Sequence, residues 1–428
     1  MKLTKHKLGE LLDVTRGTSL SGEYFATQGD YMRLTCGNFD YQNNCFKSNT
    51  SKDNLYYIGN FNQEYLMEKD DIITPLTEQA VGLLGSTAWV PESGKYIQSQ
   101  DVAKITPYEK LLDKKFCYYL ISSKVVKQQL SAAAQQTKIR HTSPDKIKDC
   151  TVWIPSLEEQ TKIGQFLYDI DSKITLNRQI NDNLEAMARQ LYDYWFVQFD
   201  FPDEKGKPYK SSGGKMVWNE KLKTSIPYNW QVLPLDKIGK FKNGINYTKG
   251  EEGNKLYKIV NVRNISSSSF FVDNSDLDVL SLNSQNGDNY LVNPSNILIA
   301  RSGTPGATRL LRTNERNVIY CGFIICYALN DVTFKNYMFF TIKKLEQVTK
   351  SQSNGSILNN ISQDILKRLW ITLPPCGLNG KFNDSIMPLF TSIRKNQEEI
   401  EVLTKQRDEL LPLLMNGQAT VNYHLSAC

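Results

Sequence analysis

One long segment, residues 156–197, decides the architecture of this chain, and it reads SLEEQTKIGQFLYDIDSKITLNRQINDNLEAMARQLYDYWFV. Selected side chains in it recur with spacings that alternate between four and three residues. They are Ile163, Leu167, Ile170, Ile174, Asn177, Asn181, Leu184, Ala188, Leu191 and Trp195. This spacing is typical of the a/d seam of a coiled coil, and it is held for more than four heptads. The sequence therefore predicts a helix about 60 Å long that pairs with another helix.

The same seam recurs 219 residues later, near the C-terminal end of the chain. Its members are Phe382, Ile386, Leu389, Ile393, Asn396, Ile400, Leu403, Arg407, Leu410 and Leu414. Asn177 and Asn396 occupy equivalent positions, and a buried Asn fixes the register of a helix pair at a cost in stability. We expect the two helices to pair antiparallel, because a parallel pair needs a connector that spans a full helix. The alternative is two separate amphipathic helices, but this stripe is narrower than theirs.

The repeat extends over the rest of the chain with little identity but with a constant order. Leu8–Leu11 matches Leu235–Ile238, Asp71–Thr74 matches Asn296–Ile299, and Ile154-Pro155 matches Leu373-Pro374. The offset drifts from 227 between Leu8 and Leu235 to 219 between Pro155 and Pro374, as small insertions and deletions in loops would produce. The chain is therefore two copies of one unit.

Short apolar runs separated by Gly, Asn, Asp and Ser fill the part of each copy that precedes the long helix. They predict a mainly β domain with one helix, near residues 112–130 in the first copy and 335–350 in the second. A last element begins at Ser143-Pro144 and at Ser362-Gln363, where Ser is a good N-cap. The predicted fold class is α+β, with a pseudo two-fold repeat and an antiparallel coiled coil.

These features divide the chain into six predicted segments. They are a first recognition-type domain at 1–155, a central helix at 156–197, a connector at 198–229, a second domain at 230–375, a distal helix at 376–416 and a C-terminal tail at 417–428.

Composition excludes several protein classes. The chain has 428 residues, of which 40% are hydrophobic and 22% charged, as in ordinary globular proteins. No apolar run approaches the ~20 residues of a membrane span, so we expect no membrane partner and a cytoplasmic location. Eight Cys without a CxxC pair and three scattered His offer little to a metal site. The net charge of +6 permits a nucleic-acid partner without proving one.

Catalytic motifs are missing from the sequence. It has no GxxxxGK[ST] or GxGxxG phosphate loop, and no Asn-Pro-Pro-aromatic tetrad such as amino-methyltransferases use. Pro144-Asp145 followed by Asp171-x-Lys173 formally matches a metal-dependent nuclease pattern. However, Asp171 and Lys173 flank the seam positions Ile170 and Ile174, which favours a structural role. We therefore predict no catalytic or metal-binding residues.

Polar side chains beside Gly gather in corresponding loops of both domains. Arg, Lys, Asn, Gln, Ser and Thr are the residues that contact phosphates and base edges. Any one of them can equally be a solvated loop residue, but both copies carry them at matching places with different residue types. The predicted DNA-binding candidates are Arg16, Thr18, Ser19, Arg33, Asn38, Gln79, Lys138, Arg140, His141, Lys242, Asn243, Asn246, Tyr247, Arg263, Asn264, Arg301, Ser302, Thr304, Arg309, Asn359 and Asn360.

A family resemblance rests on the central helix and its flanks. The carrying segments are Ile154–Gly164, Asp169–Ile174, Asn183–Ala188, Tyr194–Phe196 and Ile226–Trp230. Together with the repeated layout of a proline-ended strand followed by a long helix, they resemble the specificity subunit of type I restriction–modification systems. The resemblance covers essentially the whole chain. One departure is that Leu373–Gly377 lacks the Leu-Glu-Glu-Gln continuation seen after Ser156.

The resemblance implies a DNA-binding subunit without catalytic activity. Each domain would recognise one half of a split double-stranded DNA sequence, and the helix pair would set the gap. Two modification subunits would flip and methylate an adenine from S-adenosylmethionine. Restriction subunits would use ATP and Mg²⁺ to translocate and cleave DNA. This chain itself would bind no cofactor.

Two other classes of function stay open from the sequence. One is a DNA methyltransferase or nuclease in its own right, against which the missing cofactor loops argue. The other is a coiled-coil adaptor that binds only protein.

Overall fold

Two long helices, α4 (Leu157–Tyr192) and α10 (Cys376–Met415), dominate the computed structural model of the chain. A wider turn over Asp193–Val197 extends α4. Every predicted seam position is buried or half-buried, whereas other apolar residues of α4, such as Leu176 and Met187, are exposed. The seam, and not general apolarity, therefore determines which side of each helix is covered.

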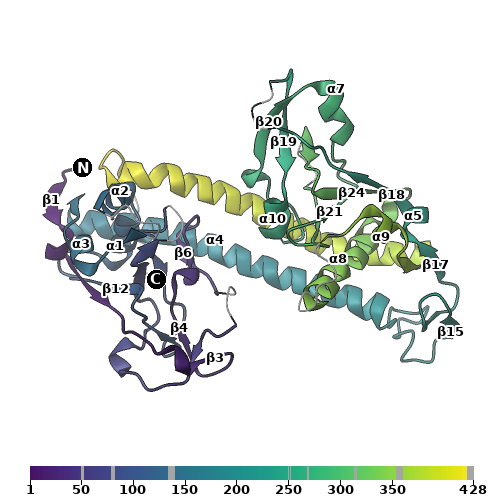
Figure 1. Ribbon diagram of the computed structural model, residues 1–428, viewed down its shortest axis with the longest axis horizontal. Helices are drawn as coiled ribbons and strands as arrows, with labels where there is room; N and C mark the ends of the chain where they lie inside the picture. Colours follow the sequence, from purple (N-terminus) through teal and green to yellow (C-terminus); the bar gives the residue numbers. More distant parts are fainter. Residues whose placement is uncertain are drawn as a thin grey trace. The chain divides into compact units, whose positions relative to one another are not determined.

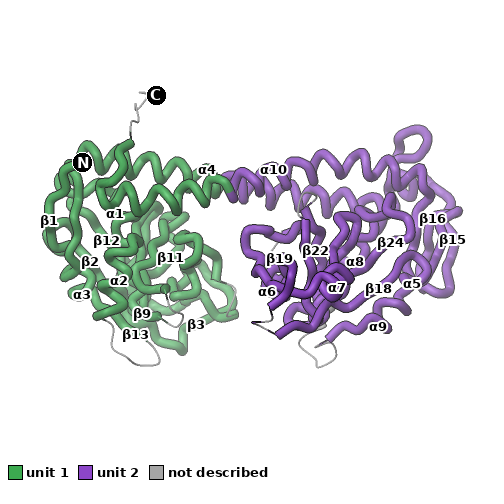
Figure 2. Tube along the Cα trace, turned by 90° about the horizontal axis from the view of Figure 1, so that it is seen from above, with its two compact units in different colours: residues 1–175, 402–428 green, residues 176–401 purple. Residues whose placement is uncertain are grey.

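The structure describes residues 1–49, 53–78, 82–133, 140–248, 250, 252–267, 269–312, 316–352 and 360–421. The chain forms two compact units, each built from segments distant in sequence (Figure 2). Unit 1 consists of Met1–Thr175 and Val402–Cys428, and unit 2 of Leu176–Glu401. Each unit thus contains about half of α4, whereas most of α10 belongs to unit 2 and its last part to unit 1.

In unit 1 the start of α4 packs on the end of α10. Ile163 and Leu167 belong to the same buried cluster as Leu414. Farther along α4, Asp171 accepts a hydrogen bond from Nη1 of Arg407 at 2.8 Å. Since a later residue of α4 meets an earlier residue of α10, the two helices run antiparallel in this unit (Figure 1).

The helices run antiparallel in unit 2 as well, as expected. Asn177 Nδ2 donates to Glu399 Oε2 at 2.8 Å, and Asn396 Nδ2 donates to Asn181 Oδ1 at 2.9 Å. The two asparagines at equivalent repeat positions, Asn177 and Asn396, therefore bond to other partners and not to each other. These polar pairs satisfy side chains that the seam buries.

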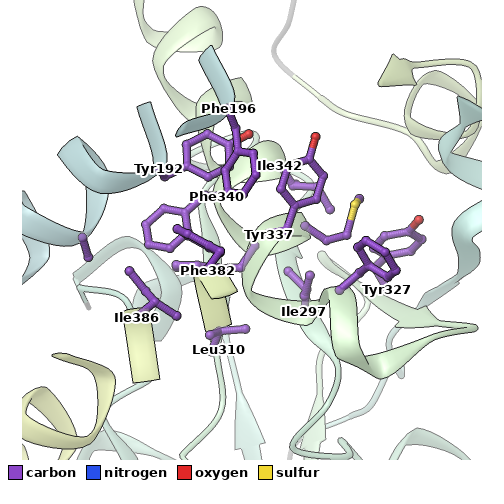
Figure 3. Packing of buried hydrophobic residues seen from close by; sticks show 14 of the residues in the cluster. Tyr192, Phe196, Ile297, Leu310, Tyr327, Tyr337, Phe340, Ile342, Phe382 and Ile386 are labelled. Carbon is purple, nitrogen blue, oxygen red and sulfur yellow. The ribbon is translucent and has the colours of Figure 1, made fainter. Parts of the chain in front are cut away.

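Aromatic side chains form a buried cluster where α4 ends and α10 begins, in unit 2. Tyr192 and Phe196 lie against Tyr337, Phe340 and Phe382 (Figure 3). The ring centroids of Phe196 and Phe382 are 4.8 Å apart in an edge-to-face arrangement. Such pairs add stability beyond the area that they bury. This cluster fixes the domain of unit 2 to both long helices.

Unit 1 is a mainly β domain with two four-stranded sheets and smaller strand pairs. The first sheet has the order β10-β8-β12-β2 and the second β11-β4-β7-β3. The bounds of its strands are β1 Thr4–Lys7, β2 Leu12–Arg16, β3 Phe25–Ala26, β4 Tyr31–Arg33, β5 Phe39–Asp40, β6 Cys45–Phe46, β7 Tyr56–Tyr57, β8 Ile72–Pro75, β9 Thr77–Glu78, β10 Ala88–Trp89, β11 Tyr96–Ile97, β12 Val102–Pro107, β13 Arg140–His141 and β14 Thr151–Ile154. Its short helices are α1 Lys114–Ile121, α2 Lys124–Ala133 and α3 Pro144–Lys148.

Unit 2 repeats this arrangement. Its main sheet has the order β22-β21-β24-β18, and its second sheet the order β20-β19-β23. The strands are β15 Met216–Asn219, β16 Thr224–Pro227, β17 Gln231–Pro234, β18 Gly239–Asn243, β19 Lys255–Val260, β20 Asp278–Leu282, β21 Ile297–Ala300, β22 Thr308–Leu310, β23 Val318–Tyr320, β24 Ile324–Leu329 and β25 Trp370–Leu373. The helices are α5 Leu235–Ile238, α6 Val262–Ser267, α7 Ser284–Gly287, α8 Lys335–Gln352 and α9 Gln363–Lys367.

The shared topology confirms the predicted repeat at the level of the fold. In both units one short helical segment, the 3-10 turn Leu8–Glu10 in unit 1 and α5 in unit 2, leads into a strand that pairs antiparallel with the last strand of the main sheet, as β2 does with β12 and β18 with β24. In both units a parallel pair, β4 with β11 and β19 with β23, leads into that last strand.

One predicted helix of unit 1 is in fact two. The sequence suggested a single helix near residues 112–130, but the chain forms α1 and α2 with a break at Ser122-Ser123. The Ser122 hydroxyl donates to the carbonyls of Tyr118 and Tyr119, both at 3.2 Å. Such bonds from a Ser hydroxyl to preceding carbonyls destabilise and bend a helix, which favours the break here.

Within the described ranges, no helix is long and apolar enough to cross a membrane. The same residues contain no group of three or more His, Cys, Asp or Glu that could hold a metal ion.

Candidate nucleic-acid interface

The loop that follows β2 in unit 1 is attached to the turn before β12 by backbone hydrogen bonds. Gly17 N donates to Val102 O at 3.3 Å, and Thr18 N donates to Gln98 O at 3.2 Å. A Cβ at position 17 would overlap the carbonyl oxygen of Gln98. Only Gly allows this close approach.

The loop after β18 in unit 2 has the same attachment. Gly244 N donates to Ile324 O at 3.0 Å, and Ile245 N donates to Tyr320 O at 2.9 Å. A Cβ at position 244 would overlap the carbonyl oxygen of Cys321. The two glycines that the repeat aligns, Gly17 and Gly244, therefore both let a loop approach the backbone of the neighbouring turn closely.

A third and a fourth segment join this place in each unit. In unit 1, Leu76 N donates to Asp101 O at 2.8 Å, and Thr142 N donates to Leu76 O at 2.9 Å. These bonds tie the end of β8 to the turn before β12 and to the approach to α3. Four segments far apart in sequence thus meet at one end of the strands of the main sheet, where β2 and β8 end and β12 begins.

The same two bonds recur in unit 2. Arg301 N donates to Phe323 O at 2.8 Å, and Ile361 N donates to Arg301 O at 2.8 Å. We call the four segments together a tip. Tip 1 comprises residues 16–19, 76–78, 98–101 and 140–142, and tip 2 comprises residues 243–247, 301–304, 320–323 and 360–361.

Tip 1 collects five of the predicted DNA-binding residues. Arg16 is exposed, and its Nε donates to Gln100 O at 2.8 Å. Within the described residues this is the only side-chain bond of Arg16, so both terminal nitrogens of the guanidinium are left for a ligand there. Arg140 is half-buried and donates to Ser131 Oγ at 3.0 Å. The other three, with side chains that are exposed or half-buried, are Thr18, Ser19 and His141.

Tip 2 collects seven predicted residues. Arg301 is half-buried, and no described side chain bonds to its guanidinium. Thr304 Oγ1 lies 2.6 Å from Ser266 Oγ, which joins α6 to the tip. Tyr247 donates to Asn261 Oδ1 at 3.3 Å. The remaining members, exposed or half-buried, are Asn243, Asn246, Ser302 and Asn360.

The structure contradicts the predicted DNA contact of three residues, Asn38, Asn264 and Arg309, because their side chains are buried. Asn38 is 3% exposed, and its Oδ1 accepts from Thr35 N at 2.9 Å. Asn264 is 1% exposed, and its Oδ1 accepts from Asn261 N at 2.8 Å. Both asparagines stabilise local turns, so their amides are not available to a nucleic acid.

Arg309 is the third residue for which the predicted DNA contact is wrong. It is 5% exposed, and its Nη1 lies 3.1 Å from Glu346 Oε2 on α8. Burial opposes the charge on Glu346, but Lys343 and Arg309 outweigh it and lower the pKa of that carboxyl to about 2. Arg309 therefore neutralises a buried acid and cannot contact DNA.

Three further candidates lie outside the tips. The Arg33 guanidinium lies over the ring of Phe25, 3.9 Å from its centroid. Arg263 pairs with Asp278 at 2.9 Å. Lys242 is exposed, and its Nζ donates to Asn289 O at 2.6 Å. The candidates Gln79, Lys138 and Asn359 lie outside the described residues.

The residues of the formal nuclease pattern do not converge on a metal site. Asp171 accepts hydrogen bonds from Tyr119 at 2.7 Å and from Arg407 at 2.8 Å. Asp145 is exposed in the first turn of α3, where the helix dipole stabilises a negative charge. Asp171 therefore joins α4 to α10 in unit 1 through its ion pair with Arg407.

One segment of each tip was not predicted from the sequence, namely the turn before the last strand of the main sheet. It contains Gln100 and Asp101 in tip 1, and Gly322 and Phe323 in tip 2. These residues carried no polar-loop signal of their own in unit 2. The repeat could have indicated them, because each turn directly precedes a matched strand, β12 or β24.

Comparisons with known proteins agree with one another. Residues 2–186 match the family described as "Type I restriction modification DNA specificity domain". The chain is 26% identical to the type I restriction enzyme MjaIX specificity subunit of Methanocaldococcus jannaschii over 313 residues, 72% of this chain and 69% of that protein. It is 20% identical to the HindI specificity subunit of Haemophilus influenzae, over 76% of this chain and 81% of that protein.

A solved structure has a similar fold over nearly the whole chain. It is the S subunit of a type I restriction-modification system from M. genitalium, with a TM-score of 0.58 and 16% identity. The alignment covers 97% of this chain and 96% of that one. At this identity the likeness concerns the fold alone.

Proposed function

We propose that the chain is a specificity subunit of a type I restriction–modification system, and that tip 1 and tip 2 each recognise one half of a split double-stranded DNA sequence. The match of residues 2–186 to the specificity-domain family supports this proposal, as do two relatives named specificity subunits that align over 72% and 76% of the chain. One observation carries this proposal. The two tips have the same backbone hydrogen bonds but different side chains at equivalent places, Arg16 against Asn243 and Leu76 against Arg301. Arg favours guanine and Asn favours adenine in the major groove, so the two tips favour different bases.

The helix pair then serves as the spacer that sets the gap between the half-sites. The polar pairs formed by Asn177 and by Asn396 support this role, because they bond only in one register. A register that cannot slip gives a spacer of constant length.

The catalytic work belongs to partner subunits in this proposal. Two modification subunits flip an adenine and methylate it with S-adenosylmethionine, and restriction subunits use ATP and Mg²⁺. The chain itself acts in the cytoplasm, transfers no group and holds none of these cofactors. Incubation of the purified chain with DNA and labelled S-adenosylmethionine tests this directly, since methyl transfer by the chain alone would contradict it.

A selection experiment tests the recognition by the two tips. The full chain is incubated with random duplex DNA, and the bound DNA is sequenced. We expect a motif with two defined halves and an undefined gap. Arg16→Ala should relax one half only, and Arg301→Ala the other half only. An arginine that is bidentate to guanine contributes about 1–3 kcal/mol, so one base in each half should lose its preference.

A matched control separates recognition from general charge. Lys405→Ala removes a positive charge from the solvent side of α10, where the Lys405 side chain is 76% exposed, and should leave both halves unchanged. Weaker binding to every sequence, with a smaller salt dependence, would mark an arginine as a phosphate contact. A chain that enriches no sequence at all would favour the adaptor function.

A further inference from the structure

Phe323 is the most exposed phenylalanine side chain among the described residues and lies in tip 2. It is 60% exposed, in the turn between β23 and β24. Phe is usually buried, and a single exposed apolar side chain needs no special explanation. The position of this one, in the middle of a group of hydrogen-bonding side chains, calls for one.

The backbone around Phe323 is held from two other segments of the tip. Its carbonyl accepts from Arg301 N at 2.8 Å, and Gly322 N donates to Ile245 O at 2.8 Å. Ile324 N donates back to Cys321 O at 2.9 Å. The phenyl ring is therefore presented to solvent by a fixed turn, which lowers the entropy lost on binding a ligand.

The equivalent position in tip 1 carries a different chemistry. There Asp101 O accepts from Leu76 N at 2.8 Å, as Phe323 O accepts from Arg301 N. The backbone of the turn is thus kept, while the side chain changes from a carboxylate to a phenyl ring. A position with a constant backbone and a variable side chain is what half-site specificity requires.

We propose that Phe323 is a specificity-determining residue that packs on the 5-methyl group of a thymine in the half-site of tip 2. This inference rests on the proposed function. A phenyl ring makes no ordinary hydrogen bond, so it gains little from phosphates or from the polar edges of bases. The thymine methyl group is the apolar group that the major groove offers. Arg301 beside it supplies the polar contact that positions the ring.

The test removes the methyl group and the ring separately. Duplexes that carry the selected motif are made with deoxyuridine in place of each thymine of the second half-site, one at a time. This change deletes only the methyl group. Wild-type chain should bind one of these duplexes about fourfold more weakly, the factor expected for one buried methyl-sized group. Phe323→Ala should bind the thymine and deoxyuridine duplexes equally, whereas Phe323→Leu should keep part of the difference.

Two controls make every outcome decisive. The first half-site selected by Phe323→Ala should match that of the wild type, which shows that the variant is folded. Lys405→Ala, which removes an exposed charge outside both tips, should leave the deoxyuridine effect intact. If wild-type chain is indifferent to the methyl group at every thymine, or Phe323→Ala keeps the sensitivity, the inference is wrong and the proposed function stands. If wild-type chain selects no two-part motif, both fail.

Discussion

Lengthening the helix pair should lengthen the gap in the recognised DNA. Asn181 bonds to Asn396 and lies near Ile393 O, so residue 183 of α4 is level with residue 394 of α10. We consider four residues inserted after Asn183 together with four inserted after Arg394. At ~1.5 Å per residue each helix grows by about 6 Å, and four residues complete slightly more than one helical turn. The seam therefore stays nearly in phase.

The expected change in DNA follows from the spacing of base pairs. One helical turn of DNA spans ~34 Å and about ten base pairs, so 6 Å corresponds to one or two base pairs. The motif methylated in cells that carry the complete system should show unchanged half-sites and a gap longer by that amount. Four residues inserted after Lys205, in the exposed connector, are the matched control and should change nothing. An unaltered gap with the paired insertions, or altered half-sites, would refute the spacer.

Three further predictions concern stability and the tips. Arg407→Leu leaves the partly buried Asp171 without its cation and should lower the free energy of unfolding by about 3 kcal/mol in urea titrations, and a second change, Asp171→Leu, should restore part of it. Gly244→Ala should relax the second half-site alone in the DNA selection, because its Cβ would overlap the Cys321 carbonyl; equal damage to both halves would show that the glycine does not act locally. The pKa of the Glu346 carboxyl is lowered from 4.5 to about 2. The contribution of its negative charge to the free energy of unfolding is therefore complete above pH 4.5 and is lost as the pH falls toward 2. The difference in stability between wild type and Glu346→Gln should shrink over that interval, and a constant difference would contradict the prediction.

The long helices could be predicted from the sequence because a periodic signal survives without tertiary information. The spacing of four and three residues identified the buried side of both helices, down to the half-buried Leu184 and Leu403. The partners of the seam asparagines could not be predicted in the same way. Which residue of α10 faces Asn177 depends on the register of the pair, and the register depends on all contacts along it.

The tips could be predicted only in part, because the fold uses the same side chains for its own hydrogen bonds. Arg16 and Arg309 are identical as letters, yet one is exposed at a tip and the other neutralises Glu346 in the interior. Asn246 and Asn264 differ in the same way. Local sequence does not show burial of a polar residue, since burial requires a partner supplied by a distant segment. Phe323 was missed for the opposite reason, because an apolar residue suggests the core.

The hydrogen bonds of the tips explain how one scaffold can carry different specificities. The amide groups of Gly17, Leu76, Gly244 and Arg301 are all bonded to the backbone of a neighbouring segment and not to side chains. The tip backbone therefore depends little on which exposed side chains it carries, apart from the two close-packed glycines and the buried Gln98, whose Nε2 donates to Thr15 O at 2.8 Å and to Val102 O at 3.1 Å. A change such as Asp101 to Phe323 alters the surface of the tip, our proposed DNA contact, without removing any backbone bond that holds the turn. Specificity can thus diverge between the two units at small cost to the fold that presents it.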